Sequence, residues 1–147
     1  MRYTRSIDWG TFYEQFDRVL AEMAGERFDL IVAIARWGVI PAGLLQQELH
    51  LPLRVIAINY RDEKNAPRYD DAKILEDVPF PIKGKTILLV DDVSRTGRTI
   101  ARASEYLAGN TIRTFLLNGK VLEGIPFAAD YELFHTDECL RMSWKRD

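Results

Sequence analysis

Apolar runs alternate with amphipathic helical patterns along most of this chain, and this alternation restricts the possible folds more than any other feature. The run Phe28–Ala35 is rich in Ile, Leu, Val and Ala, as in a strand that is buried on both faces. A second run, Lys85–Val90, has the same β-branched and apolar character and follows a turn signal at residues 81–84. Strands that alternate with helices form right-handed crossovers and a mostly parallel sheet. We therefore predict an α/β, Rossmann-like fold in which helices flank the sheet.

The remaining elements follow from periodicity and from residues that start or stop helices. Apolar residues three or four apart predict a helix over Trp9–Ala24, which Gly25 ends. Pro41 fits the first turn of a second helix that continues through Leu49. Further predicted elements are strands at Leu53–Tyr60 and Ile112–Leu117, a helix at Thr99–Ala108, a polar loop from Arg61 to Lys73, and short strand or irregular structure from Tyr131 onward.

Composition excludes several classes of protein. The 147 residues suffice for one domain with a proper core and are too few for two ordinary ones. A net charge of -2 argues against a general affinity for nucleic acid or acidic lipid. One cysteine, Cys139, excludes an internal disulfide, and with only His50 and His135 a histidine-rich metal site is not expected. No secretory signal or membrane-length apolar run is visible, so we expect a cytoplasmic protein.

The segment 88–100, LLVDDVSRTGRTI, places reactive groups at a predicted strand end. Ligands of open α/β sheets bind beyond the carboxyl ends of strands, so we expect Asp91 and Asp92 to face solvent there. The residues from Ser94 to Thr99 offer hydroxyls, a tight turn at Gly97 and a helix N-terminus, which together bind phosphate. Paired carboxylates accept hydrogen bonds from a sugar diol or help to hold Mg²⁺. A ribose phosphate satisfies all of these groups; the alternative for the acids alone is a helix cap at a solvated edge.

Two blocks resemble the type I phosphoribosyltransferases. Val90–Thr99 is similar to the signature with which that family binds phosphoribosyl pyrophosphate (PRPP), and Ile34–Ala42 resembles its pyrophosphate loop. The chain most resembles the short bacterial and archaeal xanthine-guanine enzymes. The resemblance implies a single domain over residues 1–147 with a small C-terminal hood, usually paired as a homodimer or homotetramer. It also implies a reaction, in which a base displaces pyrophosphate from C1 of PRPP with Mg²⁺ and yields a nucleoside monophosphate.

The resemblance assigns a role to each matching residue. Asp91 and Asp92 would be the catalytic pair, meeting the ribose hydroxyls and ordering Mg²⁺ mainly through water. A non-proline cis peptide is expected between Ala35 and Arg36. The 5′-phosphate would be bound by Ser94, Arg95, Thr96, Gly97, Arg98 and Thr99. The pyrophosphate would be bound by Ala35, Arg36, Trp37 and Gly38. A mobile loop would bring Tyr60, Arg61 and Lys64 to the pyrophosphate.

The base-binding end matches this family less well. Enzymes for 6-oxopurines carry an aspartate where this chain has Arg95, and a charged arginine cannot accept a proton from the base. Lys120 stands where those enzymes place a donor to the exocyclic O6, and Trp144 matches the second of two C-terminal tryptophans. Cys139 falls where the first, base-stacking tryptophan belongs.

Two classes of function therefore stay open. The first is a purine phosphoribosyltransferase that acts on guanine, xanthine or hypoxanthine, with transfer to a different base as a variant. The second is a nucleotide-sensing regulator similar to the pyrimidine-operon attenuator proteins, which also lack the aspartate. Contact with RNA is disfavoured by the acidic balance of the chain.

Overall fold

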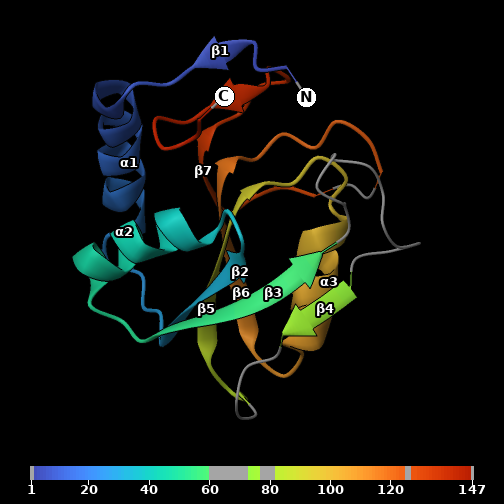
Figure 1. Cartoon of the computed structure of the whole chain (residues 1–147). Helices are drawn as coiled ribbons and strands as arrows, with labels where there is room; N and C mark the ends of the chain where they lie inside the picture. The colour runs from blue at the N-terminus through green and yellow to red at the C-terminus, as the bar shows by residue number, and fades with distance from the viewer. Residues whose placement is uncertain (1, 60–72, 77–81, 125–126, 147) are drawn as a thin grey trace.

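A six-stranded sheet forms the centre of the molecule (Figure 1). The computed structural model describes residues 2–59, 73–76, 82–124 and 127–146. The strand order is β4-β3-β2-β5-β6-β7, and every neighbouring pair is parallel except β3 with β4. The strands are β2 (Leu30–Ala35), β3 (Leu53–Asn59), β4 (Lys73–Glu76), β5 (Thr86–Val93), β6 (Thr111–Asn118) and β7 (Tyr131–Phe134). The predicted mostly parallel α/β fold is confirmed, whereas the antiparallel strand β4 was not predicted.

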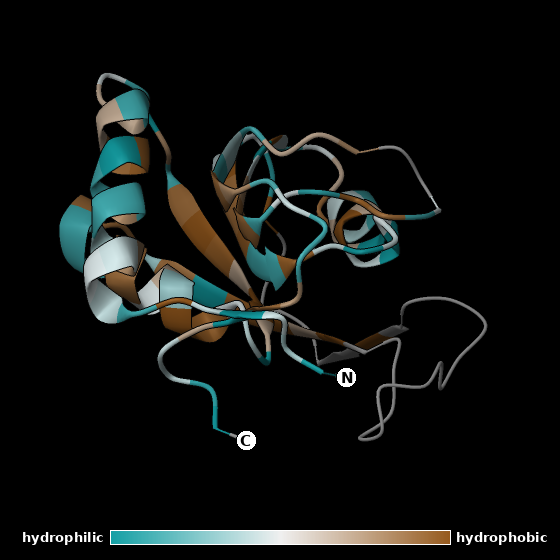
Figure 2. Ribbon diagram, turned by 90° about the horizontal axis from the view of Figure 1, so that it is seen from above, coloured by the Kyte–Doolittle hydropathy of each residue, from teal (hydrophilic) through white to brown (hydrophobic). Residues whose placement is uncertain are grey.

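Three helices cover the two faces of this sheet. Helices α1 (Trp9–Met23) and α2 (Val39–Leu49) lie on one face, and α3 (Arg98–Tyr106) lies on the other (Figure 1). Alternate residues of β5 point to opposite faces, so Val90 packs in the cluster with α1 and α2 while Leu89 packs with α3. The interior strands are accordingly brown in Figure 2, and the covering helices carry teal.

The start of α1 is fixed by Asp8. Its side-chain oxygen Oδ1 accepts a hydrogen bond of 2.7 Å from the backbone N–H of Thr11, which satisfies one of the free amides at a helix N-terminus. The same bond lowers the pKa of Asp8, because it favours the ionised carboxylate. The helix therefore begins at Trp9, as predicted.

The two ends of the chain pair with each other. Strand β1 (Arg5–Ser6) runs parallel to β8 (Leu140–Arg141), and Figure 1 shows the N and C labels side by side. This two-stranded sheet belongs to the small C-terminal hood, and the sequence did not predict the N-terminal contribution to it. Among the residues that the structure describes, no helix is long and apolar enough to cross a membrane.

The chain turns in opposite directions after β2 and after β5. From β2 it passes through α2 to β3, whereas from β5 it passes through α3 to β6 on the other side. Such a topological switch point opens a crevice beyond the carboxyl ends of the two strands. At this point a side-chain Cβ on Gly38 would lie 2.5 Å from the carbonyl oxygens of both Ile34 and Val90, and 3.1 Å from Cα of Asp91. Only glycine lets the loop after β2 pack this closely against β5.

We expect Gly38→Ala to separate that loop from β5, because two carbonyl oxygens occupy the space of the new methyl group. The predicted loss of stability is about 1–3 kcal/mol, measured by urea unfolding. Gly43→Ala is the matched control, since Gly43 lies in α2 with open space around it and alanine favours helix by up to ~1 kcal/mol. Equal stability of Gly38→Ala and wild type would contradict the proposed close contact.

Candidate functional site

The two adjacent acids lie within β5. The pairing of β5 with β6 continues from Asp91 opposite Leu116 to Val93 opposite Asn118. The prediction that the strand ends at Val90 and leaves both carboxylates facing solvent is therefore wrong. Asp91 is only 7% exposed and the Asp92 side chain only 15% exposed. Because successive strand residues point to opposite faces, the two side chains leave the strand on different sides.

Burial leaves Asp91 short of stabilising partners. Its Oδ1 accepts a bond of 2.8 Å from the backbone N–H of Asp92, whose own Oδ1 accepts one of 2.7 Å from Val93. Desolvation, followed by repulsion from Asp92, raises the pKa of Asp91 well above its usual range, and the Asp92 amide and Lys145 oppose this only in part. The ionised form of Asp91 is therefore disfavoured in the free protein. A ligand that brings hydrogen-bond donors or positive charge would stabilise that form.

Lys145 brings a positive charge from the C-terminal tail to the second acid. Its Nζ lies 3.0 Å from Oδ2 of Asp92, and the two side chains are 13% and 15% exposed. The same ammonium lies 4.9 Å from the ring centre of Trp37, over whose ring the guanidinium of Arg36 also lies, at 5.0 Å. Lys145 was not predicted as a site residue, because only the fold brings the tail to β5.

The loop between β2 and α2 faces this acid pair. The peptide bond between Ala35 and Arg36 is cis, as the resemblance implied. The backbone N–H of Gly38 donates a hydrogen bond of 2.9 Å to the carbonyl of Ile34, which closes a tight loop. The residues Arg36 and Trp37 within this loop are exposed. The loop thus presents backbone and a cationic side chain beside the carboxylates.

The loop after β5 has the features of an anion site. The residue Ser94 is 3% exposed, and its Oγ has no hydrogen-bond partner among the described residues. Gly97 takes a left-handed conformation with φ of 73° and has no side chain to cap α3, which begins at Arg98. The Arg98 N–H donates to Thr96 Oγ1 at 3.3 Å, so this loop supplies part of the cap. A helix N-terminus next to the unsatisfied Ser94 hydroxyl suits a phosphate group. Thr96 and Thr99, both partly buried, complete the loop.

Arg95 takes part in this loop through its backbone. Its carbonyl oxygen accepts bonds from the N–H groups of Leu122 at 3.0 Å and Glu123 at 3.2 Å, while the residue itself is exposed. A Cβ on Gly124 would lie 2.7 Å from the carbonyl oxygen of Thr96, so this second loop also packs directly on the first. The loop after β6 is therefore held against the loop after β5.

A cavity of about 380 Å³ lies beside the loop after β6. Its lining includes Lys120, Leu122, Phe127 and His135, so one predicted base-binding residue lies at a cavity. Another hollow, of about 270 Å³, lies over α1 and β7 and is lined by none of the predicted site residues.

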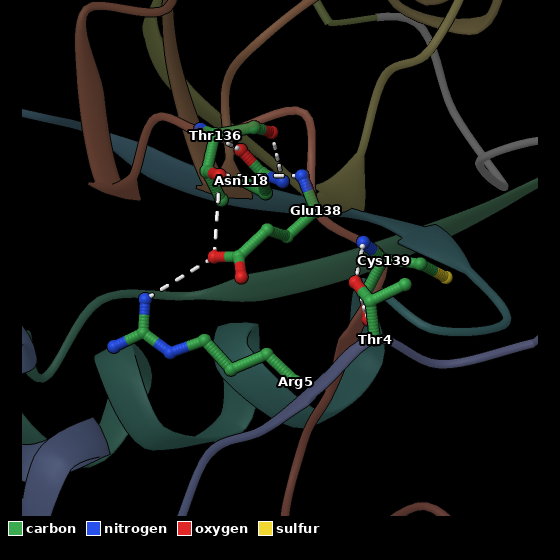
Figure 3. Close-up of polar contacts among 6 residues, drawn as sticks. All are labelled: Thr4, Arg5, Asn118, Thr136, Glu138 and Cys139. Carbon is green, nitrogen blue, oxygen red and sulfur yellow. Dashed lines mark hydrogen bonds and ion pairs between the residues drawn. The ribbon is translucent and has the colours of Figure 1, made fainter.

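Asn118 holds the hood next to this cavity (Figure 3). Its Nδ2 donates to the carbonyl of Thr136 at 2.9 Å, and its Oδ1 accepts from the Thr136 N–H at 3.2 Å and from the Lys120 N–H at 3.4 Å. Asn118 was not predicted as a site residue, although its position at the end of an apolar strand was a usable signal.

The other two predicted base-binding residues do not line this cavity in the part of the chain that the structure describes. The backbone of Cys139 bonds to Thr4 in both directions, at 2.9 Å each (Figure 3). The ring of Trp144 packs edge-on to Phe12 at 5.3 Å and lies 5.6 Å from Trp9. Tyr60, Arg61 and Lys64, predicted for the mobile loop, lie outside the described residues.

The acids fit a magnesium ion that keeps most of its water. Both side chains offer carboxyl oxygens, the ligand type that Mg²⁺ prefers. Oδ2 of Asp92 already forms an ion pair with the ammonium of Lys145. Among the described residues no group of three histidine, cysteine or acidic side chains gathers around a metal position. An ion bound here would therefore need oxygens from water and substrate in addition to Asp91 and Asp92.

The protein-family model described as the phosphoribosyl transferase domain matches residues 9–114 of this chain. The chain belongs to the phosphoribosyltransferase family. The bifunctional protein PyrR of Haemophilus ducreyi is 30% identical over 137 residues, which cover 80% of this chain and 76% of that protein. The xanthine-guanine phosphoribosyltransferase of Idiomarina loihiensis is 29% identical over 101 residues, 65% of this chain and 62% of the relative.

Solved phosphoribosyltransferase structures have the same fold. The purine phosphoribosyltransferase of Pyrococcus horikoshii aligns with a TM-score of 0.81 at 25% identity, covering 97% of this chain and 94% of that one. The xanthine-guanine-hypoxanthine phosphoribosyltransferase of Helicobacter pylori aligns with a TM-score of 0.69 at 15% identity, which shows the fold alone. The fold predicted from the resemblance is thus confirmed over nearly the whole chain.

We expect Asp91→Asn to stabilise the protein at pH 7–8 by on the order of a few degrees in Tm. The folded protein retains a proton that the unfolded chain releases above pH ~4, so stability from this group falls as pH rises from there through the raised pKa. Asparagine mimics the protonated acid, and the gain should disappear near pH 4. Asp17→Asn, an equal charge change at an exposed position of α1, should leave Tm unchanged. A lower Tm for Asp91→Asn at every pH would contradict the prediction.

Proposed function

We propose that this chain transfers the phosphoribosyl group of PRPP to a purine base in a Mg²⁺-dependent reaction. The products are a nucleoside monophosphate and pyrophosphate. The observation that carries this proposal is the buried acid pair of β5 between a phosphate-type loop with an unpartnered Ser94 hydroxyl and the tight loop closed by Gly38. Membership of the phosphoribosyltransferase family supports it.

Each part of PRPP has a matching set of groups. Asp91 and Asp92 would accept hydrogen bonds from the ribose hydroxyls, which relieves the unfavourable burial of Asp91. The loop from Ser94 to Thr99 would hold the 5′-phosphate at the N-terminus of α3. The loop from Ala35 to Gly38 would hold the pyrophosphate, with Arg36 offsetting its charge. When bound, Mg²⁺ would neutralise negative charge on the departing pyrophosphate.

Positioning of these groups supplies the catalysis in this proposal. Departure of pyrophosphate leaves positive charge on the ribose ring, and fixed carboxylates next to the ring favour that charge. The base must wait within reach of C1, and the cavity lined by Lys120 and Phe127 is a place where it can be held. Guanine, xanthine and hypoxanthine are the bases that we infer, because the ammonium of Lys120 suits an exocyclic O6. Relatives named for xanthine-guanine and purine transfer favour the same class.

A nucleotide-sensing regulator of the same fold is the second candidate. Arg95 favours it, since that residue removes the usual proton acceptor near the base. The relatives named PyrR are called bifunctional proteins, which is consistent with a role beyond transfer. The same PRPP site would then bind PRPP or a nucleotide without turnover. Binding without product formation separates this candidate from the enzyme.

The decisive experiment is a coupled assay of the purified protein with PRPP, Mg²⁺ and a panel of bases. We expect nucleotide and pyrophosphate to form with a 6-oxopurine, and the double variant Asp91→Asn/Asp92→Asn to lose at least about a hundredfold in kcat/KM while it stays folded. Asp17→Asn serves as the charge control. Calorimetric binding of PRPP without product from any base would remove the enzyme and leave the regulator. Absence of binding would remove both.

Lys120→Met should raise the KM for the base about tenfold or more, because a hydrogen bond from a charged donor contributes about 1.5–3 kcal/mol. The KM for PRPP should stay unchanged, since Lys120 lies in the cavity and not in the phosphate loop. Lys85→Met, which removes the same charge from an exposed position, is the control. Equal KM values for the base in Lys120→Met and wild type would remove Lys120 from base recognition.

A further inference from the structure

The C-terminal tail holds one cation in place at the acid pair. Ser143 Oγ donates to the carbonyl of Ile7 at 2.6 Å, and the ring of Trp144 packs against Phe12 of α1. The backbone N–H of Lys145 donates to the carbonyl of Met142 at 2.9 Å, which closes a turn. With both preceding residues anchored, the side chain of Lys145 is directed at Asp92.

The ammonium of Lys145 lies where a metal cation would be expected. Its Nζ is 3.0 Å from Oδ2 of Asp92, and both side chains are more than four-fifths buried. It also lies over the ring of Trp37 at 4.9 Å, a distance at which a cation is attracted by the ring face. The positive charge opposes the repulsion that two adjacent carboxylates exert on each other.

We propose that Lys145 is an exchangeable counter-ion of the acid pair, displaced from Asp92 when the metal and PRPP bind. This inference rests on the proposed function. A divalent ion at Asp92 repels the ammonium and competes with it for the same carboxylate, whether the ion binds directly or through water, so metal binding opposes the ion pair and the free energy of the pair is subtracted from the metal affinity. Trp37 belongs to the loop proposed for pyrophosphate, so a ligand there acts on the second contact of Lys145 as well. The tail thus couples metal binding to occupation of the pyrophosphate loop.

The exchange predicts that removal of Lys145 strengthens metal binding. Mn²⁺ is the probe, and free Mn²⁺ is measured by electron paramagnetic resonance with the full chain at low salt. We expect Lys145→Met to lower the Kd for Mn²⁺ about fivefold, the effect of an ion pair of ~1 kcal/mol. Arg146→Met removes the same charge from the adjacent, exposed residue and should change the Kd less than twofold. A Kd in Lys145→Met that equals that of Arg146→Met, or a weaker affinity, overturns the proposal.

A double-variant comparison ties the effect to Asp92. In the Asp92→Asn background the ion pair is already absent, so adding Lys145→Met should not change the Kd for Mn²⁺. A fivefold change that persists in this background overturns the proposed exchange at Asp92. Thermal unfolding of each variant shows that the comparison is made between folded proteins.

Hydrogen exchange of the tail provides a readout independent of affinity and activity. When Mn²⁺ and PRPP bind to wild type, the amide of Lys145 should exchange faster, because the turn to Met142 loses its side-chain anchor. Slower exchange would mean that Lys145 stays and contacts the ligand, which overturns the proposal. Wild type that binds Mn²⁺ but not PRPP overturns the proposed function instead, and the Kd comparison then still tests the exchange at Asp92.

Discussion

The close contact between the loop after β2 and the end of β5 is the constraint on which the site depends. The two strands are parallel neighbours at the point where the chain diverges, so their carboxyl ends meet. Gly38 lets the backbones approach until carbonyl oxygens of both strands fill the space of a side chain. The Cα of Asp91 lies at this contact, and burial of its side chain, followed by repulsion from Asp92, raises its pKa. Burial of Asp91 lowers the stability of the fold. The same burial means that a ligand which donates hydrogen bonds or positive charge to this carboxyl would stabilise it.

Periodicity and apolar content were enough to predict the central elements. The predicted strand Phe28–Ala35 became β2, and the helix predicted over Thr99–Ala108 became α3 with ends shifted by one or two residues. Strand β1 has no local signal, because its two polar residues become a strand only by pairing with Leu140 and Arg141 at the far end of the chain. The cis peptide before Arg36 followed from family resemblance and has no signature in composition.

The geometry of the candidate site was predictable where residues adjacent in sequence lie together, as in the acid pair and the loop after β5. It was not predictable where tertiary contacts decide the environment. The burial of Asp91 depends on a strand ladder that continues to Asn118, and the sequence alone placed the strand end earlier. Lys145 and Asn118 were missed for the same reason, since each acts on a segment distant in the chain. Trp144 was noticed by its position, yet its ring packs on α1.

Arg95 stands where the 6-oxopurine enzymes carry an aspartate, and the backbone contacts of its loop are compatible with this difference. Within the described residues, Arg95 contributes its backbone carbonyl as acceptor for two amides of the loop after β6, while the residue itself is exposed. The hydrogen bonds from Leu122 and Glu123 use the backbone of residue 95 and not its side chain. The loop after β5 can therefore keep its shape whether this residue is an aspartate or an arginine. The side chain is therefore free to change the chemistry offered to a base without disturbing the groups proposed for PRPP. If the proposed function holds, this separation would allow the residue at position 95 to differ between proteins that use different bases, while the groups proposed for PRPP stay the same.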